Sequence, residues 1–87
     1  MIIRSQGKKT IINFENVLEV ICNKANEIII RRSVDDCQEV IGTYSTEEKA
    51  VKVLDMIQNA YCNANCYFCS NGYVQNVVFN MPQDSEV

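Results

Sequence analysis

The fold is decided by residues 45–61, which read STEEKAVKVLDMIQNAY. Apolar side chains recur there at spacings of three and four residues, which is the period of a helix that buries one face. They are Ala50, Val53, Leu54, Ile57 and Tyr61, with Ala60 beside them. At the start of this stretch, the Ser45 hydroxyl can accept a hydrogen bond from the backbone amide of Glu48, whose carboxylate reaches back. The pattern predicts an amphipathic helix from residue 46 to about residue 61.

The residues before this helix have the composition of short strands separated by turns. Aliphatic and β-branched residues dominate five segments, and polar or glycine-containing turns separate them. The segments are residues 2–5, 10–14, 17–22, 27–32 and 38–44. In the first turn, Gly7 can adopt the positive φ that a tight reversal requires. Strands of this length with short connections pair as an antiparallel meander, and the apolar face of the helix is expected to cover it.

The remainder of the chain is less regular. Residues 63–72 are polar and indicate an irregular loop, whereas residues 73–79 alternate like a strand and can rejoin the sheet at an edge. After Pro82, the acidic tail 83–87 is expected to fray. The sequence therefore predicts one small α+β domain over residues 1–87, with an antiparallel meander sheet of five or six strands covered by one amphipathic helix.

Size and charge limit the partners of such a domain. The chain has 87 residues and a net charge of −3. A domain this small buries roughly 60% of its unfolded surface, so a partner or a second copy would add stability. The basic residues are scattered, and the adjacent Arg31 and Arg32 would point to opposite faces of a strand. Because nucleic-acid binding depends on clustered Lys and Arg, we expect no nucleic acid partner.

The sequence also bears on location. The longest aliphatic run is residues 28–30, whereas a membrane span needs about 20 residues. The N-terminus reaches charge at Arg4 after two apolar residues, so it has no signal-peptide core. The five cysteines are an odd number, which favours free thiols in a reducing compartment. We expect a cytoplasmic protein without a membrane partner.

The residue types present disfavour an enzyme. The sequence contains no histidine, so neither a Ser-His-Asp nor a Cys-His arrangement can form. The glycines stand singly at Gly7, Gly42 and Gly72 and make no phosphate-binding loop. We therefore predict a protein that is not an enzyme and that needs no cofactor.

Three cysteines form a C-x3-C-x2-C cluster at Cys62, Cys66 and Cys69. With Phe68 before the last cysteine, the spacing resembles the iron–sulfur motif of radical S-adenosylmethionine enzymes. In that family the motif follows the first strand of a large barrel, whereas here it follows a helix with 18 residues remaining. The short motif without its structural setting is a weak signal for that chemistry.

A structural zinc site would make smaller demands. It needs four ligands, and the fourth would be Cys22, Cys37 or a carboxylate. A thiol redox sensor is a further use of the cluster, although no basic neighbour is available to activate it. We favour the interpretation that the cysteines are incidental, because free cysteine often behaves as a small hydrophobe. Metal analysis of protein purified under reducing conditions decides between these alternatives.

Several segments resemble a family. They are residues 2–6 (IIRSQ), 11–13 (IIN), 16–17 (NV), 42–50 (GTYSTEEKA), 53–54 (VL) and 78–82 (VFNMP). In this layout the chain resembles a group of small uncharacterised proteins from Gram-positive bacteria and their mobile elements. The resemblance implies a several-stranded sheet with one helix and no catalytic activity, and it leaves the cysteine cluster outside the shared pattern.

Together these observations favour a small non-enzymatic module that binds a protein partner or forms a homo-oligomer. A thin core and unpaired strand edges support this hypothesis, because natural proteins must shield such edges or use them. The alternative is a thiolate metal-binding (zinc) or redox-sensing protein that uses Cys62, Cys66 and Cys69.

Overall fold

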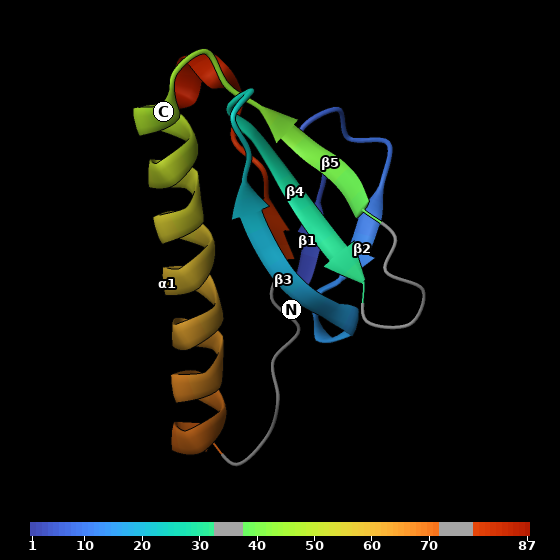
Figure 1. The fold of residues 1–87 in the computed structure, drawn as a ribbon. Helices are drawn as coiled ribbons and strands as arrows, with labels where there is room; N and C mark the ends of the chain where they lie inside the picture. The colour runs from blue at the N-terminus through green and yellow to red at the C-terminus, as the bar shows by residue number, and fades with distance from the viewer. Residues whose placement is uncertain (33–37, 72–77) are drawn as a thin grey trace.

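The computed structural model describes residues 1–32, 38–71 and 78–87, and within 64–71 the backbone only. Six strands, one long helix and two 3₁₀ turns make up this part of the chain (Figure 1). They are β1 (Ile2–Arg4), β2 (Ile11–Asn13), η1 (Phe14–Asn16), β3 (Val17–Cys22), β4 (Glu27–Arg32), β5 (Gln38–Thr43), α1 (Glu47–Asn71), β6 (Val78–Asn80) and η2 (Asp84–Glu86). The predicted α+β class is confirmed.

The strands form two sheets instead of the single meander that the sequence predicts. Sheet A has the order β2-β1-β6, with β1 antiparallel to β2 and parallel to β6, so it is mixed. Sheet B has the order β3-β4-β5 and is the antiparallel meander. The single sheet was wrong because η1 separates β2 from β3, and because the long connection through α1 returns the chain parallel to β1, as parallel pairing requires.

Sheet B follows the sequence closely. The bounds of β3 and β4 are the predicted ones, and β5 ends one residue before the predicted end. The turn between β3 and β4 is built by Asn23, whose side-chain oxygen accepts from the backbone amides of Ala25 and Glu27 at 3.0 and 2.9 Å. Asn26 takes a φ of 60° there, which asparagine tolerates better than most residues. The reversal expected at residues 34–36 lies outside the described residues.

The helix starts later and runs further than predicted. The Thr46 hydroxyl, not that of Ser45, caps it by accepting from the backbone amide of Lys49 at 3.2 Å. The Ser45 amide instead donates to the Asp84 carboxylate at 2.8 Å, so the predicted Ser45–Glu48 capping box was wrong. The loop predicted from residue 63 was also wrong, because α1 continues to Asn71. No glycine or proline lies between residues 61 and 71 to end it.

The core lies between the two sheets and the apolar stripe of α1. Figure 1 shows α1 alongside β3, with β1 and β6 behind sheet B. The residues of this core cluster are Ile3 and Ile12 from sheet A, Ile28, Ile30 and Ile41 from sheet B, Ala50, Val53 and Ile57 from α1, and Tyr44 and Met81 from the connecting segments. The predicted stripe is therefore confirmed. Each fully buried aliphatic side chain contributes roughly 1.5–3 kcal/mol.

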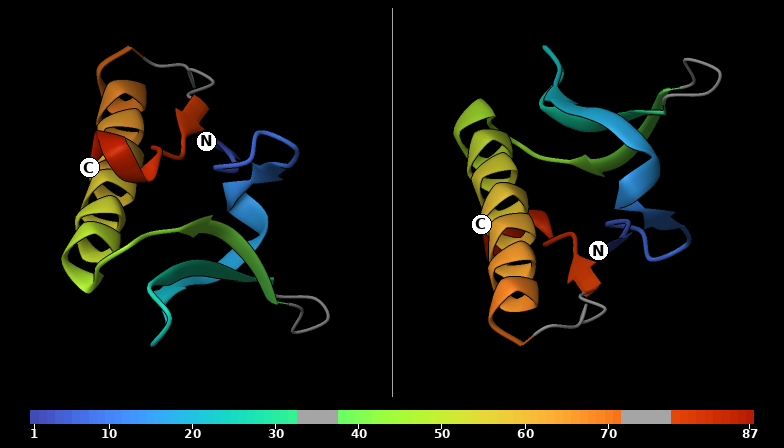
Figure 2. Two further views of the ribbon diagram at one scale, coloured as in Figure 1. Left: turned by 90° about the horizontal axis from the view of Figure 1, so that it is seen from above. Right: turned by 90° about the horizontal axis from the view of Figure 1, so that it is seen from below.

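The C-terminal residues pack against the start of α1, which differs from the frayed tail expected at 83–87 (Figures 1 and 2). The Tyr44 hydroxyl donates to the Pro82 carbonyl at 2.8 Å, and the Lys49 ammonium donates to the Asp84 carbonyl at 2.9 Å. The backbone amide of Ser45, helped by the Lys49 charge, lowers the pKa of the Asp84 carboxyl. We call residues 81–87 the C-terminal latch.

Candidate interaction groove

The three clustered cysteines all lie on α1, not in a loop. Cys62 is an exposed free thiol, while the side chains of Cys66 and Cys69 lie outside the described residues, as does Cys37. Cys22 is half-buried on β3, where its Sγ lies 3.5 Å from the Asn23 carbonyl oxygen. In the part of the chain whose side chains are described, no group of three or more His, Cys, Asp or Glu could hold a metal ion. The thiolate site remains a prediction.

The outer edge of β5 is partly occupied by Gln6. The Gln6 backbone amide donates to the Ile41 carbonyl at 2.8 Å. Its side-chain amide then imitates a strand, because it accepts from the Thr43 amide at 2.8 Å and donates to the Thr43 carbonyl at 3.0 Å. The part of the β5 edge from Ile41 to Thr43 is thereby closed by the turn after β1.

The outer edge of β3 is different. Within residues 1–32, 38–71 and 78–87, β3 pairs with β4 alone, and its backbone from Leu18 to Cys22 bonds to no third element. The outer strands of sheet A, β2 and β6, are three residues long, whereas β3 is six. Short edges and covered edges resist pairing with other chains. β3 is not short, and α1, which packs alongside it, forms no backbone hydrogen bond with it among the described residues. The one irregularity of β3 is a register shift between Val17 and Glu19, at its start.

A groove runs between this edge and the first half of α1, and we call it the β3–α1 groove. Its wider section has a volume of about 750 Å³ and is lined by Val20, Ile21, Cys22, Asn23, Lys24, Asn26, Glu47, Val51 and Leu54. A section of about 330 Å³ is lined by Phe14, Val20, Leu54, Ile57, Gln58, Tyr61 and Cys62. Val20 and Leu54 line both sections, so the two are continuous along β3.

The groove has an apolar floor and one polar wall. Val20 and Leu54 pack against the core, and at the far end the Phe14 and Tyr61 rings meet with centroids 5.1 Å apart. Val51 stands on the helix wall with 43% of its surface exposed. The other wall is the outer edge of β3, whose inner edge pairs with β4. An apolar floor beside free amide and carbonyl groups is the combination that accepts an extended peptide as an added strand.

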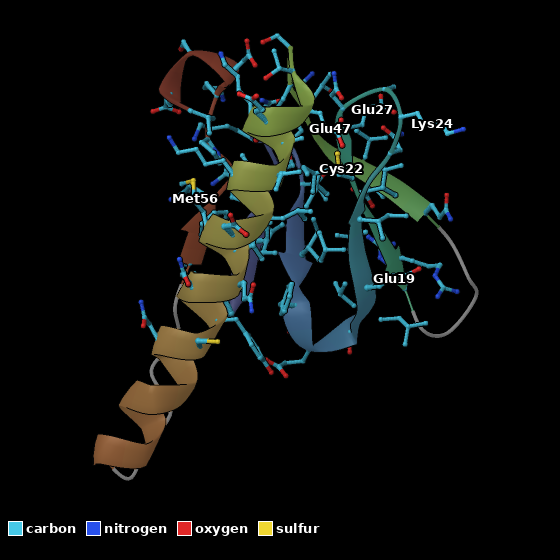
Figure 3. All side chains as sticks on the ribbon, turned by 60° about the vertical axis from the view of Figure 1, so that its left-hand side comes forward. Glu19, Cys22, Lys24, Glu27, Glu47 and Met56 are labelled. Atoms are coloured by element: carbon cyan, nitrogen blue, oxygen red, sulfur yellow. The ribbon has the colours of Figure 1, made fainter. Side chains whose placement is uncertain are left out.

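One end of the groove carries two carboxylates, Glu27 and Glu47, and one lining cation, Lys24. Glu47 lines it at the start of α1, and Glu27 accepts a hydrogen bond from the side chain of the lining residue Asn23 at 2.8 Å. Figure 3 shows Cys22, Glu27 and Glu47 at this end, with Lys24 extending away from α1. Among the described residues, no ion pair involves Glu27 or Glu47.

The sequence did not single out Val51, Glu27 or Glu47 as residues of a binding groove. Val51 carried a usable signal, since it is an apolar residue outside the buried stripe of the helix. Glu27 and Glu47 carried none, because an acidic residue on a strand or in the first turn of a helix is ordinary.

No protein-family model, curated protein or solved structure matches this chain. None of the helices in the described part of the chain is long and apolar enough to cross a membrane. The function is therefore inferred from the geometry of the chain itself.

Proposed function

We propose that this protein is a small non-enzymatic interaction module that binds an extended protein segment as an added strand along β3, inside the β3–α1 groove. The observation that carries the proposal is the edge of β3 from Leu18 to Cys22, which bonds to no third element among the described residues and borders an apolar floor. A second copy of the chain is the rival occupant of the edge.

The expected complex is weak and reversible. A backbone hydrogen bond contributes roughly 0.5–1.5 kcal/mol net, and apolar burial contributes about 25 cal/mol per Å². Association costs several kcal/mol of lost freedom, so the hydrogen bonds alone would not hold a partner. Contacts with Val20, Val51 and Leu54 supply the remainder, and they would favour apolar side chains at alternate positions of the bound segment.

We further propose that the protein is cytoplasmic and that it does not bind nucleic acid. An odd number of cysteines favours free thiols and therefore supports a cytoplasmic location. The scattered basic residues and the net charge of −3 argue against a nucleic-acid partner. The resemblance to small proteins of Gram-positive bacteria also stays a proposal.

Selection from a library of random displayed peptides tests the proposed function. The native chain should enrich peptides with alternating apolar residues, and Val51→Lys should lose them because the new side chain obstructs the groove. Met56→Lys is the matched control, since Met56 is an exposed residue of α1 that lines neither groove section. Figure 3 shows Met56 on the side of α1 away from β3.

Both variants replace exposed side chains, so their melting temperatures should stay near that of the native chain. Peptides that bind the native chain and both variants equally well would contradict the proposal, and so would a selection that enriches none.

A further inference from the structure

We infer that the segment bound in the β3–α1 groove belongs to another protein and carries Lys or Arg beside its alternating apolar residues. This inference rests on the proposed function and names the chemistry of its partner. The cationic side chain lies at the end of the groove where Glu27 and Glu47 lie.

The charge around the groove supports a basic partner. Four carboxylates of the described residues meet a cation: Glu15 meets the N-terminal ammonium, Glu19 meets Arg31, Glu39 meets Arg32, and Asp84 meets Lys49. Glu48, Asp55 and Glu86 meet none there. Glu27 and Glu47 have no such partner there. An incoming ammonium or guanidinium group would supply it and would hold one end of the segment in a fixed register.

The helix wall extends the same charge. Glu47 is followed on the outer side of α1 by Glu48 and Asp55, which line a neighbouring hollow with Val51 and Lys52. Three carboxylates against one ammonium leave this wall negative. Such a wall attracts basic segments and repels acidic ones at physiological ionic strength.

A second copy fits this end of the groove poorly. The strand it would offer, β3, reads VLEVIC and carries one acidic residue, Glu19, and no Lys or Arg. Pairing two β3 strands would therefore add negative charge beside Glu27 and Glu47 without supplying a cation on the strand. This difference in charge favours a separate protein as the partner.

Three synthetic peptides with one common core of alternating valine and threonine test the inference. The first peptide has lysine at both ends, the second has glutamine at both ends, and the third has glutamate at both ends. Fluorescence anisotropy at 50 mM salt measures their affinities for the chain. The lysine peptide should bind at least about tenfold more tightly than the glutamate peptide, because unlike charges attract and like charges repel across the groove.

Substitution of Glu27 and Glu47 tests whether their carboxylates cause the preference for the lysine peptide. Glu27→Gln combined with Glu47→Gln should reduce the tenfold preference to about threefold or less, since Glu48 and Asp55 remain. Glu39→Gln, on β5 at the other side of sheet B, is the control and should leave the preference unchanged.

Other outcomes separate the inference from the proposed function. Equal affinity for all three peptides, with slowed hydrogen exchange at the outward-facing amides of Leu18, Val20 and Cys22, would overturn the basic partner and leave strand addition standing. A lysine peptide N-methylated at alternate residues keeps its charge but lacks the backbone donors. If it binds as tightly as its parent, the attraction is only electrostatic, and both ideas fail. Failure of all three peptides to bind would also overturn the inference.

Discussion

Tyr44 holds the C-terminal latch against the core. Its ring is buried, and its hydroxyl donates to the Pro82 carbonyl, which also accepts from the Gln6 side chain at 3.2 Å. Burial, together with the nearby carboxylates of Asp84 and Glu86, raises the pKa of Tyr44 to about 12. The phenol is therefore much harder to ionise in the folded chain than in the unfolded one.

This difference predicts a loss of stability at alkaline pH. The pKa is 10.0 for an ordinary tyrosine and about 12 in the folded chain, so Tyr44 favours folding fully below pH 10 and loses that effect as pH rises towards 12. The full loss should approach roughly 3 kcal/mol, at 1.4 kcal/mol for each of the two pKa units. Tyr44→Phe should cost about 1 kcal/mol at pH 7 and then decline less between pH 10 and 12. Urea titrations at several pH values measure the free energy of unfolding of the native chain and of Tyr44→Phe. If the two decline in parallel above pH 10, Tyr44 is not the source of the alkaline loss of stability.

The first turn shows how a local pattern can mislead. The sequence places the positive φ at Gly7, yet the residue with a φ of 64° is Lys8. The Arg4 guanidinium holds this conformation by donating twice to the Lys8 carbonyl, at 3.0 and 2.9 Å. A glycine permits a left-handed conformation but does not require it, so the side-chain contact decides which residue adopts it.

The Thr46 hydroxyl caps the first turn of α1. Thr46→Ala should cost about 1 kcal/mol, because the backbone amide of Lys49 loses its acceptor. Thr46→Ser keeps a hydroxyl there and should retain most of the stability. Thermal unfolding of the two variants compares them directly. A native melting temperature for Thr46→Ala would show that Thr46 does not cap α1.

Among the elements, the locally encoded ones could be predicted. The turn built by Asn23 and the flanking isoleucines set the bounds of β3 and β4, and the apolar spacing identified the buried face of α1. The division into two sheets could not be predicted, since it depends on Ile2 pairing with Val78 from the other end of the chain. The end of α1 was missed because polar composition was taken as a loop, although no residue there breaks a helix.

In the whole molecule, the candidate site arises from the way the elements pack. The β3–α1 groove joins residues from η1, β3, the turn after it and α1. Glu27 and Glu47 lie twenty positions apart in the sequence and reach the same end of the groove only after folding. The sequence could indicate that a strand edge would be available, but not which edge or what charge would surround it.

The central claim is that β3 accepts an added strand, and nuclear Overhauser contacts test it most directly. A peptide recovered from the selection is bound to isotopically labelled chain, and contacts between the two backbones are mapped. We expect strand-like contacts from the peptide α-protons to the amides of Leu18–Cys22, with further contacts to Val51 and Leu54. A bound peptide that contacts another surface, such as the face of sheet B around the exposed Val40, and leaves those amides unchanged would contradict it.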